Sequence, residues 1–513
     1  MVLQINDNTP VIIGVGQAQH DAPADLSGVI SPVEITAEAV RRAIDDAGLS
    51  NIKNVDRLTS IRTFADSGPM FPSPFGSSKN MPKAVALKSG LSPKTLIYSA
   101  VGGDQPQTQV METAKALYAG EAKIAVICGG EAIANMKAAM RAGVQLDWSD
   151  DLDKEGLIDD GPFPEGLILS AEELKHGLMQ PLQFYAMAET ARRLDLGLSV
   201  SDYQKRSGEL LAPFSQKASE NPFSISSAPL SAEDIATPTD RNKVLAEPYT
   251  KAMIAKDGVN QAAAIVMTTL GKAKSLGLDD SQCIFLKGFA KAKEGYVSER
   301  EDVSNSTALT LALEGAMCSA GVETSEIEHA DLYSCFPIVV ERAKDCLKEA
   351  PLKSLTLTGG LPFFGGAGNN YSLHAIAEMV SELRAEKKKS SEECFGLVFA
   401  NGGFMTKHSV GVYSTHALDY DLRDRLVDFS EEMAQSSNPE IDSHYTGNAK
   451  LLSYALSYHN GQSPSAVVLA ETSDRKRVLA RYSGDIKKLS TLSKGERLDV
   501  QITAKGHEAR LGV

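Results

Sequence analysis

A pattern that occurs twice in the chain constrains its fold more than any other feature. Residues 36–61, "TAEAVRRAIDDAGLSNIKNVDRLTSI", and residues 307–336, "TALTLALEGAMCSAGVETSEIEHADLYSCF", both read as a helix that stops at Ala-Gly, an acidic linker and a strand. Two glycine pairs, Gly129-Gly130 and Gly402-Gly403, each close an apolar strand, and they lie as far apart in the chain as the two helix-ending glycines do. Two matches at one separation favour a duplicated domain.

Each copy alternates strands and helices. In the first copy, "PVIIGVG" at 10–16 reads as a buried strand, residues 32–47 as a helix that ends at a glycine, and residues 55–64 as a second strand. Strand, helix, strand is the repeating unit of layered α/β folds. We therefore predict an α/β protein with two tandem halves, at residues 1–275 and 276–425.

Two further regions do not take part in the repeat. Residues 132–247 contain an acidic loop and helical segments, and we interpret them as an insertion that caps one face of the first half. The acidic run reads as a solvated loop rather than a metal site. Residues 426–513 contain short apolar stretches separated by turn signals, which predict a small antiparallel β-barrel or sandwich.

Composition excludes several functional classes. The net charge of -14 argues against nucleic acid as a partner, because phosphate binding needs a basic surface. The six cysteines form no CxxC pair, so we expect no metal site and reduced thiols in a cytoplasmic protein. We expect no signal peptide and no membrane span, since every apolar run is far shorter than ~18 residues. The Gly14-Val-Gly16 turn lacks the third glycine of a dinucleotide-binding motif, so we read it as a strand that ends in a glycine turn and not as a dinucleotide site.

The segment "LIYSAVGGDQPQ" (96–107) reads as a strand, a sharp turn and the start of a helix. In many enzymes such a turn holds a nucleophile at the helix N-terminus, where the helix dipole stabilises an anion. Here the tip of the turn is Gly102-Gly103, with no Ser or Cys. The turn is therefore present without its usual reactive group.

Several longer strings resemble the thiolase superfamily. "GPFPEG" and "QPLQFYAMAETARR" resemble the loop domain of its sterol-carrier-type branch. "DLYSCFP", "GGLPFFGGAGNNYSLHAIAEMV" and "ANGGFMTKHSVGVYST" resemble a subgroup labelled acetyl-CoA acetyltransferase, the thiolase-like proteins type 1, which carry an added C-terminal β-domain. The resemblance runs from Pro10 to the end of the chain. It implies a duplicated thiolase fold with αβαβα layers, a loop-domain insertion and a C-terminal antiparallel β-barrel domain.

The resemblance also implies which catalytic groups are missing. Thiolases use a nucleophilic Cys, an Asn or His that binds a thioester oxygen, a His base and a second Cys. The family motifs place Gly103, Tyr333, Gly366 and Ala400 at these four positions. Backbone N–H groups near Gly103 and Gly402, together with Asn401, are the candidates for a surviving oxyanion or substrate-binding pocket.

Other side chains near these motifs have two readings each. Tyr333 is a candidate general acid or a half-buried packing residue, and His408 is a candidate catalytic residue facing the same cleft as Asn401. Cys335 is read as a small core residue rather than a relocated nucleophile. His374 is read first as a packing residue and second as a proton-transfer group. Two lysines, read by default as surface residues, are candidates for contacts with coenzyme A phosphates: Lys407 and Lys251.

Three functions follow as hypotheses. The first is a thiolase-like acyltransferase-family protein of lipid metabolism that binds acyl-CoA, with coenzyme A as part of the ligand and no covalent cofactor, and with negligible thiolysis or condensation. The second is an aldolase-type lyase on CoA esters that uses Tyr333 and Tyr371, with the β-domain in the role of the OB-type partner that such relatives need. The third is a non-catalytic scaffold that binds CoA esters or a protein. A monomer and a homodimer are both compatible with the resemblance.

Overall fold

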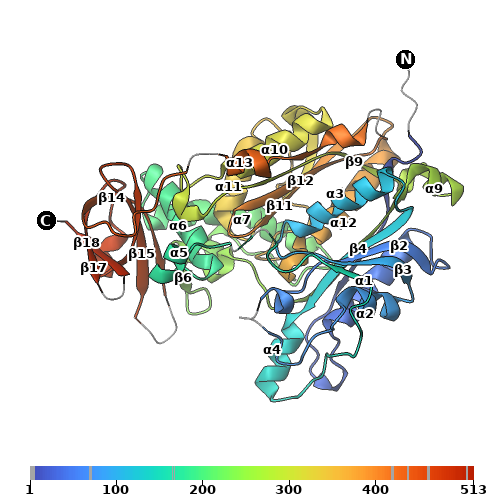
Figure 1. Ribbon diagram of the computed structural model, residues 1–513, viewed down its shortest axis with the longest axis horizontal. Helices are drawn as coiled ribbons and strands as arrows, with labels where there is room; N and C mark the ends of the chain where they lie inside the picture. Colours follow the sequence, from blue (N-terminus) through green and yellow to red (C-terminus); the bar gives the residue numbers. More distant parts are fainter. Residues whose placement is uncertain are drawn as a thin grey trace.

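The structure is a computed structural model that describes residues 6–68, 72–164, 166, 168–417, 421–435, 438–458, 463–503 and 506–512. It consists of an eleven-stranded mixed sheet layered with helices, and a smaller β-barrel at the C-terminal end of the chain (Figure 1). No helix within the described residues combines the length and the apolar character needed to cross a bilayer.

The two halves of the large sheet pair their strands in the same way. Across the sheet the first half contributes β1 (Pro10–Gln19), β8 (Asn260–Thr269), β4 (Ile124–Ala132), β2 (Asn54–Ser60), β3 (Ser92–Tyr98) and β5 (Leu157–Asp159). The second half contributes β9 (Ile284–Lys293), β12 (Lys407–Ser414), β11 (Phe395–Gly402) and β10 (Ile327–Leu332), and β13 (Leu426–Asp428) pairs with β9. In each half the first three strands are antiparallel neighbours and the next pair is parallel. β1 also pairs with β9, which joins the halves. The predicted duplication is confirmed.

Equivalent helices of the two halves begin and end alike. These helices are α1 (Pro32–Asp46) and α10 (Thr307–Ala320). Ser31 and Ser306 accept hydrogen bonds from backbone N–H groups in the first turn, which caps both helix N-termini. Gly48 and Gly321 follow the helices with the same φ of +67°, a conformation that glycine adopts without steric cost. The helix stops predicted from the repeat are confirmed.

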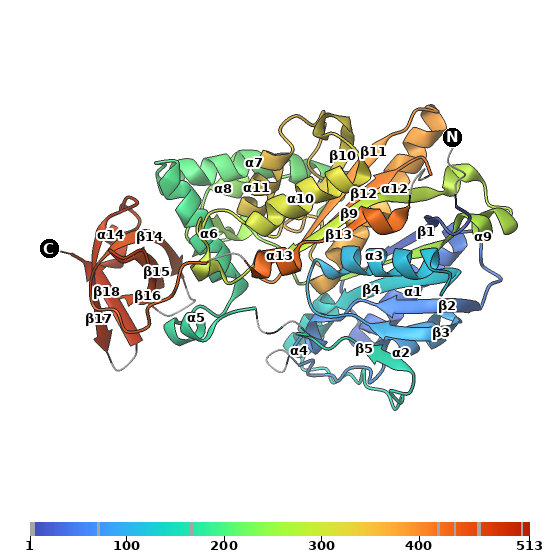
Figure 2. The same cartoon turned by 45° about the horizontal axis from the view of Figure 1, so that its top comes forward.

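Two helices form a central layer between the halves. These are α3 (Gln105–Tyr118) and α12 (Tyr371–Lys389). Each contacts strands of both halves (Figure 2). Most residues of α3 are buried. α1 and α2 (Met81–Ser89) cover the outer face of the first half, and α10 covers that of the second. The layers therefore alternate as αβαβα, as expected.

The segment between β4 and β8 holds most of the remaining helices. They are α4 (Ile133–Ala142), α5 (Ala171–His176), α6 (Pro181–Asp195), α7 (Val200–Glu220) and α8 (Ala232–Ala236), followed by the hairpin β6 (Val244–Ala246) and β7 (Tyr249–Thr250). The segment does more than cap a face, because its strand β5 pairs in parallel with β3 and extends the sheet. Pairing of this kind covers an exposed sheet edge. Among the described residues, three further helices lie outside this segment and before the barrel: α9 (Leu270–Ser275), α11 (Pro337–Cys346) and α13 (Ser430–Ala434).

The C-terminal strands close into a barrel with its own core. They are β14 (Gly447–Ser457), β15 (Ser465–Glu471), β16 (Arg477–Tyr482), β17 (Arg497–Thr503) and β18 (Gly506–Leu511). Around the barrel the order is β14-β15-β16-β18-β17, and β14 pairs with β15 to close it. All pairs are antiparallel except β16 with β18, and α14 (Ile486–Leu489) lies between β16 and β17 in the chain. The predicted barrel is confirmed, with one parallel pair, and this strand order is that of an OB-type barrel.

The barrel is docked on α6 by buried polar groups. Arg193 Nη2 donates to Tyr454 Oη at 2.9 Å, and that hydroxyl donates to Glu247. Ser453 Oγ donates to the Met187 carbonyl at 2.5 Å. Because buried polar groups are expensive to leave unpaired, these contacts hold the barrel against the helix in one position.

Candidate functional site

The turn between β3 and α3 is held by the second half of the molecule. The Gly102 N–H donates to Asn369 Oδ1 at 3.2 Å, and Ser372 Oγ donates to the Gly103 carbonyl at 2.7 Å. Gly102 has a φ of +147°, which side chains other than glycine rarely adopt. The loop that precedes α12 and the first turn of α12 therefore fix the conformation of the glycine turn.

Tyr333 occupies the space that a side chain at position 103 would need. Tyr333 follows β10 directly, is 6% exposed, and meets the Tyr371 ring edge to face at 5.5 Å. A Cβ atom added to Gly103 would lie less than 3.0 Å from the Tyr333 hydroxyl and from the Asn401 carbonyl, a separation that real Cβ atoms essentially never show. A cysteine therefore does not fit at position 103 while Tyr333 stands there.

Asp104 fills the neighbouring space in the same way. A Cβ atom on Gly402, at the end of β11, would lie less than 3.0 Å from Asp104 Oδ1. The structure thus brings Gly103, Tyr333, Asn401 and Gly402, which the sequence analysis singled out, into one buried group together with Asp104; we call these five residues the turn cluster. Burial raises the pKa of the Tyr333 phenol well above its usual range, and Cys335 and Asp104 add to the shift. Tyr333 therefore stays a neutral phenol.

Asn401 links the turn cluster to two further side chains. Its Nδ2 donates to Tyr185 Oη at 2.8 Å and to Cys335 Sγ at 3.6 Å. Burial raises the pKa of the Cys335 thiol to about 12, so the thiol stays protonated and is a poor nucleophile. Among the described residues, no histidine hydrogen-bonds to Cys335. This environment is that of a small core residue.

Both histidines considered from the sequence are buried and neutral. His408 lies opposite Asn401 in the β11–β12 pair, with Nε2 at 3.0 Å from Ser306 Oγ, and burial lowers its pKa to about 3. His374 lies on α12 with Nδ1 at 2.7 Å from Gln17 Oε1, and burial likewise lowers its pKa to about 3. His408 is adjacent to the turn cluster, whereas His374 packs against β1.

The remaining sequence candidates are spread around this region. The Gly366 N–H donates to the Lys256 carbonyl at 2.8 Å in the loop before α12, and Ala400 is fully buried within β11. Lys251 is exposed, as expected. Reading Lys407 as a surface lysine is wrong: it is 6% exposed, because β12 is an inner strand covered on both faces.

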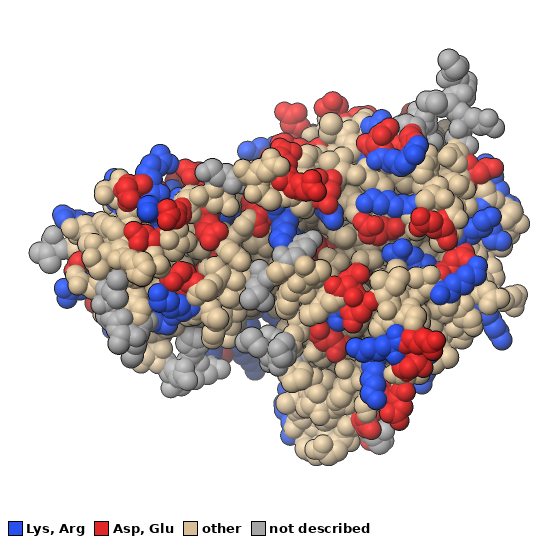
Figure 3. Space-filling view, in the orientation of Figure 1, with Lys and Arg blue, Asp and Glu red and all other residues tan. Residues whose placement is uncertain are grey.

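A cavity with a volume of about 630 Å³ lies beside the turn cluster. It is bounded by the start of α1, the loop before α2, α4, the start of α6, and Phe336; the surface is hollowed near α4, at the lower centre of Figure 3. The lining is mostly apolar. Phe336 stacks on Tyr185 with ring centroids 4.2 Å apart, and Tyr185 bonds to Asn401, so one pair of rings separates the cavity from the turn cluster.

Glu131 lines this cavity and was missed by sequence reasoning. It is the last residue but one of the apolar strand β4, is 3% exposed, and accepts a hydrogen bond from the Phe64 N–H at 2.6 Å. Burial raises its pKa to about 8, and Asp66 and Asp257 add to the shift. The available signal was an acidic residue inside an otherwise apolar strand, "AVICGGEA". For Tyr185, on an amphipathic helix, the sequence offered no such signal.

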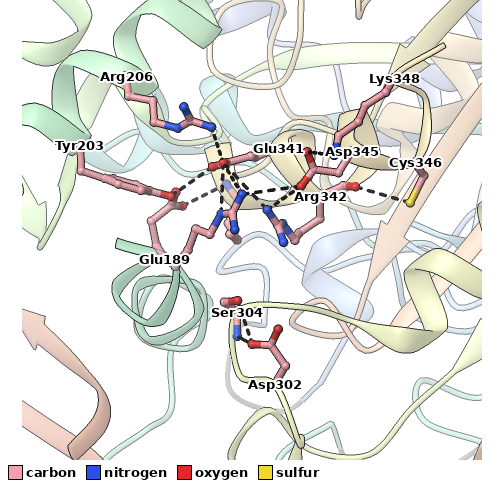
Figure 4. Close-up of polar contacts among 12 residues, drawn as sticks. Glu189, Tyr203, Arg206, Asp302, Ser304, Glu341, Arg342, Asp345, Cys346 and Lys348 are labelled. Carbon is pink, nitrogen blue, oxygen red and sulfur yellow. Dashed lines mark hydrogen bonds and ion pairs between the residues drawn. The ribbon is translucent and has the colours of Figure 1, made fainter. Parts of the chain in front are cut away.

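A buried polar network positions the segment that carries Tyr333 and Phe336 (Figure 4). Glu189 of α6 is fully buried and accepts from Tyr203 Oη at 2.6 Å, Tyr249 Oη at 2.5 Å and the Ile338 N–H at 3.0 Å. Burial raises its pKa to about 7. The Ile338 N–H belongs to the first turn of α11, so Glu189 caps the helix that follows Phe336.

A second carboxylate, that of Glu341 on α11, bonds to side chains of α6 and α7. Glu341 accepts from Arg206 at 2.6 Å and from Arg192 at 3.2 Å, and Tyr203 Oη donates to it at 3.2 Å (Figure 4). Arg192 lies on α6 and Arg206 on α7. The inserted helices therefore hold α11, and with it the loop between the cavity and the turn cluster.

Comparison with known proteins identifies the family. No protein-family model matches the chain, and no curated protein matches it. Among solved structures, a monomeric SCP2-thiolase-like protein type 1 from Mycobacterium smegmatis is 31% identical, with a TM-score of 0.81 over 99% of this chain and 100% of that chain.

Two other solved structures share the fold at lower identity. An Ltp2-ChsH2(DUF35) aldolase is 21% identical, with a TM-score of 0.57 over 82% of this chain and 100% of that chain. An acetyl-CoA acetyltransferase from Syntrophomonas wolfei is 15% identical, with a TM-score of 0.51 over 80% of this chain and 100% of that chain. Identity above 30% along the full length of the first structure decides the assignment: the chain belongs to the thiolase superfamily, as an SCP2-thiolase-like protein type 1.

Proposed function

We propose that the protein binds an acyl-CoA thioester and does not catalyse thiolysis or Claisen condensation. The observation that carries the second part is the pairing of Gly103 with Tyr333, which leaves no room for the nucleophilic cysteine of a thiolase. The protonated Cys335 thiol does not replace it. Loss of the nucleophile alone commonly lowers kcat by ~10³-fold or more.

The cavity next to Phe336 supports the binding part of the proposal. Its volume of about 630 Å³ lies within the range of roughly 300–1,000 Å³ that is typical of small-molecule sites. Its apolar lining suits an acyl group, with the coenzyme A moiety extending toward solvent past the start of α6. Backbone N–H groups of the turn cluster remain the candidates for contact with the thioester oxygen.

Calorimetric titration of the full-length protein with CoA, acetyl-CoA and longer acyl-CoAs tests this. We expect affinity to rise with the length of the acyl chain. The variant Ala255→Phe places a ring in the cavity and should weaken binding of the longer esters at least tenfold. Ala142→Phe, at the exposed end of α4, is the matched control. Absence of binding by every ester would refute the proposal, and thiolysis of acetoacetyl-CoA at ordinary enzyme rates would refute its second part.

A second candidate is an aldolase-type lyase on CoA esters. Two observations favour it: the neutral phenols Tyr333 and Tyr371 lie side by side, and an OB-type barrel is fused to the chain and docked on α6. Tyr371 Oη lies 2.6 Å from Thr358 Oγ1, so it is held in place. Retro-aldol cleavage of a 3-hydroxyacyl-CoA that falls at least 100-fold in Tyr333→Phe would support this function, and unchanged cleavage would exclude Tyr333. If the protein binds CoA esters but shows neither thiolysis nor retro-aldol cleavage, the third candidate, a non-catalytic scaffold, is the function that remains.

We further propose a monomeric protein of the cytoplasm that acts in lipid metabolism. Strand β5 covers the outer edge of β3, so that edge is closed to a second copy. All six cysteines are free, as is usual in a reducing compartment. Analytical ultracentrifugation at micromolar concentration checks the oligomeric state, and a concentration-dependent dimer would contradict the monomer.

A further inference from the structure

The position of Glu131 in the large cavity is built by segments that are distant in the sequence. The Phe64 N–H donates to its Oε1 from the segment after β2. Gly368, in the loop before α12, leaves room for the carboxyl, since a Cβ atom there would lie less than 3.0 Å from the same oxygen. Among the described residues, Phe64 is the one donor to this carboxyl, and Oε2 accepts no hydrogen bond. The carboxyl is thus fixed in place with one oxygen left for a ligand.

The charges around the cavity are unfavourable to an anion. Besides Glu131, the charged residues of the lining are Asp66, Lys137 and Asp257. Lys137 Nζ pairs with Asp257 at 2.9 Å, so its charge is balanced, and Asp66 accepts from Tyr98 Oη at 2.6 Å. Burial, together with Asp66 and Asp257, raises the pKa of Glu131 to about 8, so at neutral pH it is mainly a protonated acid that donates a hydrogen bond.

We infer that Glu131 is the polar recognition group of this cavity, and that it selects a bulky, neutral, apolar acyl group carrying a ketone or hydroxyl oxygen over one that ends in a carboxylate. The apolar lining takes the hydrocarbon, and the carboxyl of Glu131 donates to the oxygen. An anionic end group would lose its hydration beside Asp66, with no unpaired cation in the lining to offset that cost. The inference rests on the proposed acyl-CoA binding only for the statement that the ligand is an acyl group.

Fluorescence titration with a small set of matched probes tests the inference without coenzyme A. The probes are the neutral naphthyl ketone prodan, an analogue in which a methylene replaces the carbonyl, and an analogue in which a carboxylate replaces the propionyl group. With the full-length protein near neutral pH, we expect prodan to bind ~10-fold more tightly than the methylene analogue, the value of one good hydrogen bond, and the carboxylate to bind least. Above pH 9 the preference for the ketone should disappear, because ionised Glu131 no longer donates.

Two variants separate recognition from folding. Glu131→Gln keeps a donor of the same shape and should retain the ketone preference at every pH. Glu131→Met removes the donor and should bind prodan and the methylene analogue equally. Failure of prodan to bind, equal binding of the neutral pair by the natural protein, or a ketone preference that survives in Glu131→Met would each overturn the inference.

The two proposals fail separately. If the probes behave as expected and no acyl-CoA binds, the cavity recognises such ligands and the proposed function is wrong. If acyl-CoAs bind but the three probes bind with equal affinity, the proposed function stands and the role of Glu131 is refuted.

Discussion

The turn cluster and the Glu131 cavity lie one pair of aromatic rings apart and differ in what fills them. In the turn cluster the side chains of Tyr333 and Asp104 occupy the space above two glycines. In the cavity the Glu131 carboxyl faces a volume of about 630 Å³. The comparison teaches that packing alone excludes a side chain at position 103, because the Tyr333 hydroxyl already occupies that space, whereas the neighbouring cavity stays open.

The largest expected effect concerns the network that separates the two regions. Glu189→Ala removes the acceptor for Tyr203, Tyr249 and the first turn of α11. Leaving these buried donors unpaired should lower the free energy of unfolding by about 4 kcal/mol. Urea denaturation measures this, with Glu209→Ala, an exposed glutamate of α7, as the control. A change below about 1 kcal/mol would mean that the network does not hold the loop at Phe336.

The next largest expected effect is the loss of stability when a side chain is added at position 103 of the turn cluster. Gly103→Cys places a side chain against the Tyr333 hydroxyl and the Asn401 carbonyl, so we expect a loss of about 3 kcal/mol and no thiolase activity. Adding Tyr333→Ala should recover part of the stability lost in the single variant, because it removes one of the two obstructing groups. Denaturation of both proteins, with an acetoacetyl-CoA thiolysis assay, checks this. A fully stable or active Gly103→Cys protein would break the comparison.

The buried carboxyl of Glu131 should make the stability of the protein depend on pH. The pKa of Glu131 is about 8 in the folded protein against 4.5 for an ordinary glutamate, so the folded state holds the proton between these values. Stability therefore falls as pH rises from 4.5 toward 8. Glu131→Gln removes this contribution and should be more stable than the natural protein by a few kcal/mol at pH 8.5, with no gain near pH 4. Thermal denaturation across this pH range measures the difference, and a gain that is equal at every pH would contradict the assignment.

The smallest expected effect is at His408. Because burial lowers the pKa of its imidazole to about 3, this residue is neutral throughout the physiological range. His408→Gln should cost about 1 kcal/mol, the value of its hydrogen bond to Ser306, and leave acyl-CoA affinity unchanged between pH 5 and 8. A pH-dependent loss of affinity would show that His408 takes part in the site after all.

Local patterns were enough to predict much of the fold. The helix stops at Gly48 and Gly321 and the strands that end in paired glycines depend on residues near one another in the sequence, and the duplication was visible as a match between two such patterns. The pairing of β5 with β3 and the parallel pair in the barrel were not predicted, because strand neighbours that are distant in the chain leave no local signal.

For the site, too, residue identity could be read from the sequence, whereas contacts between distant segments could not. The sequence by itself determined that Gly103, Tyr333, Gly366 and Ala400 carry neither a thiol nor an imidazole; that they stand at the four catalytic positions of a thiolase is a prediction from the resemblance. Only the tertiary structure decided that the Tyr333 hydroxyl stands over Gly103 and that an enclosed Glu131 faces a cavity. The physical reason is that burial, and the pKa that follows from it, arises when β4, the segment after β2 and the loop before α12 pack together, and no short stretch of sequence contains that contact.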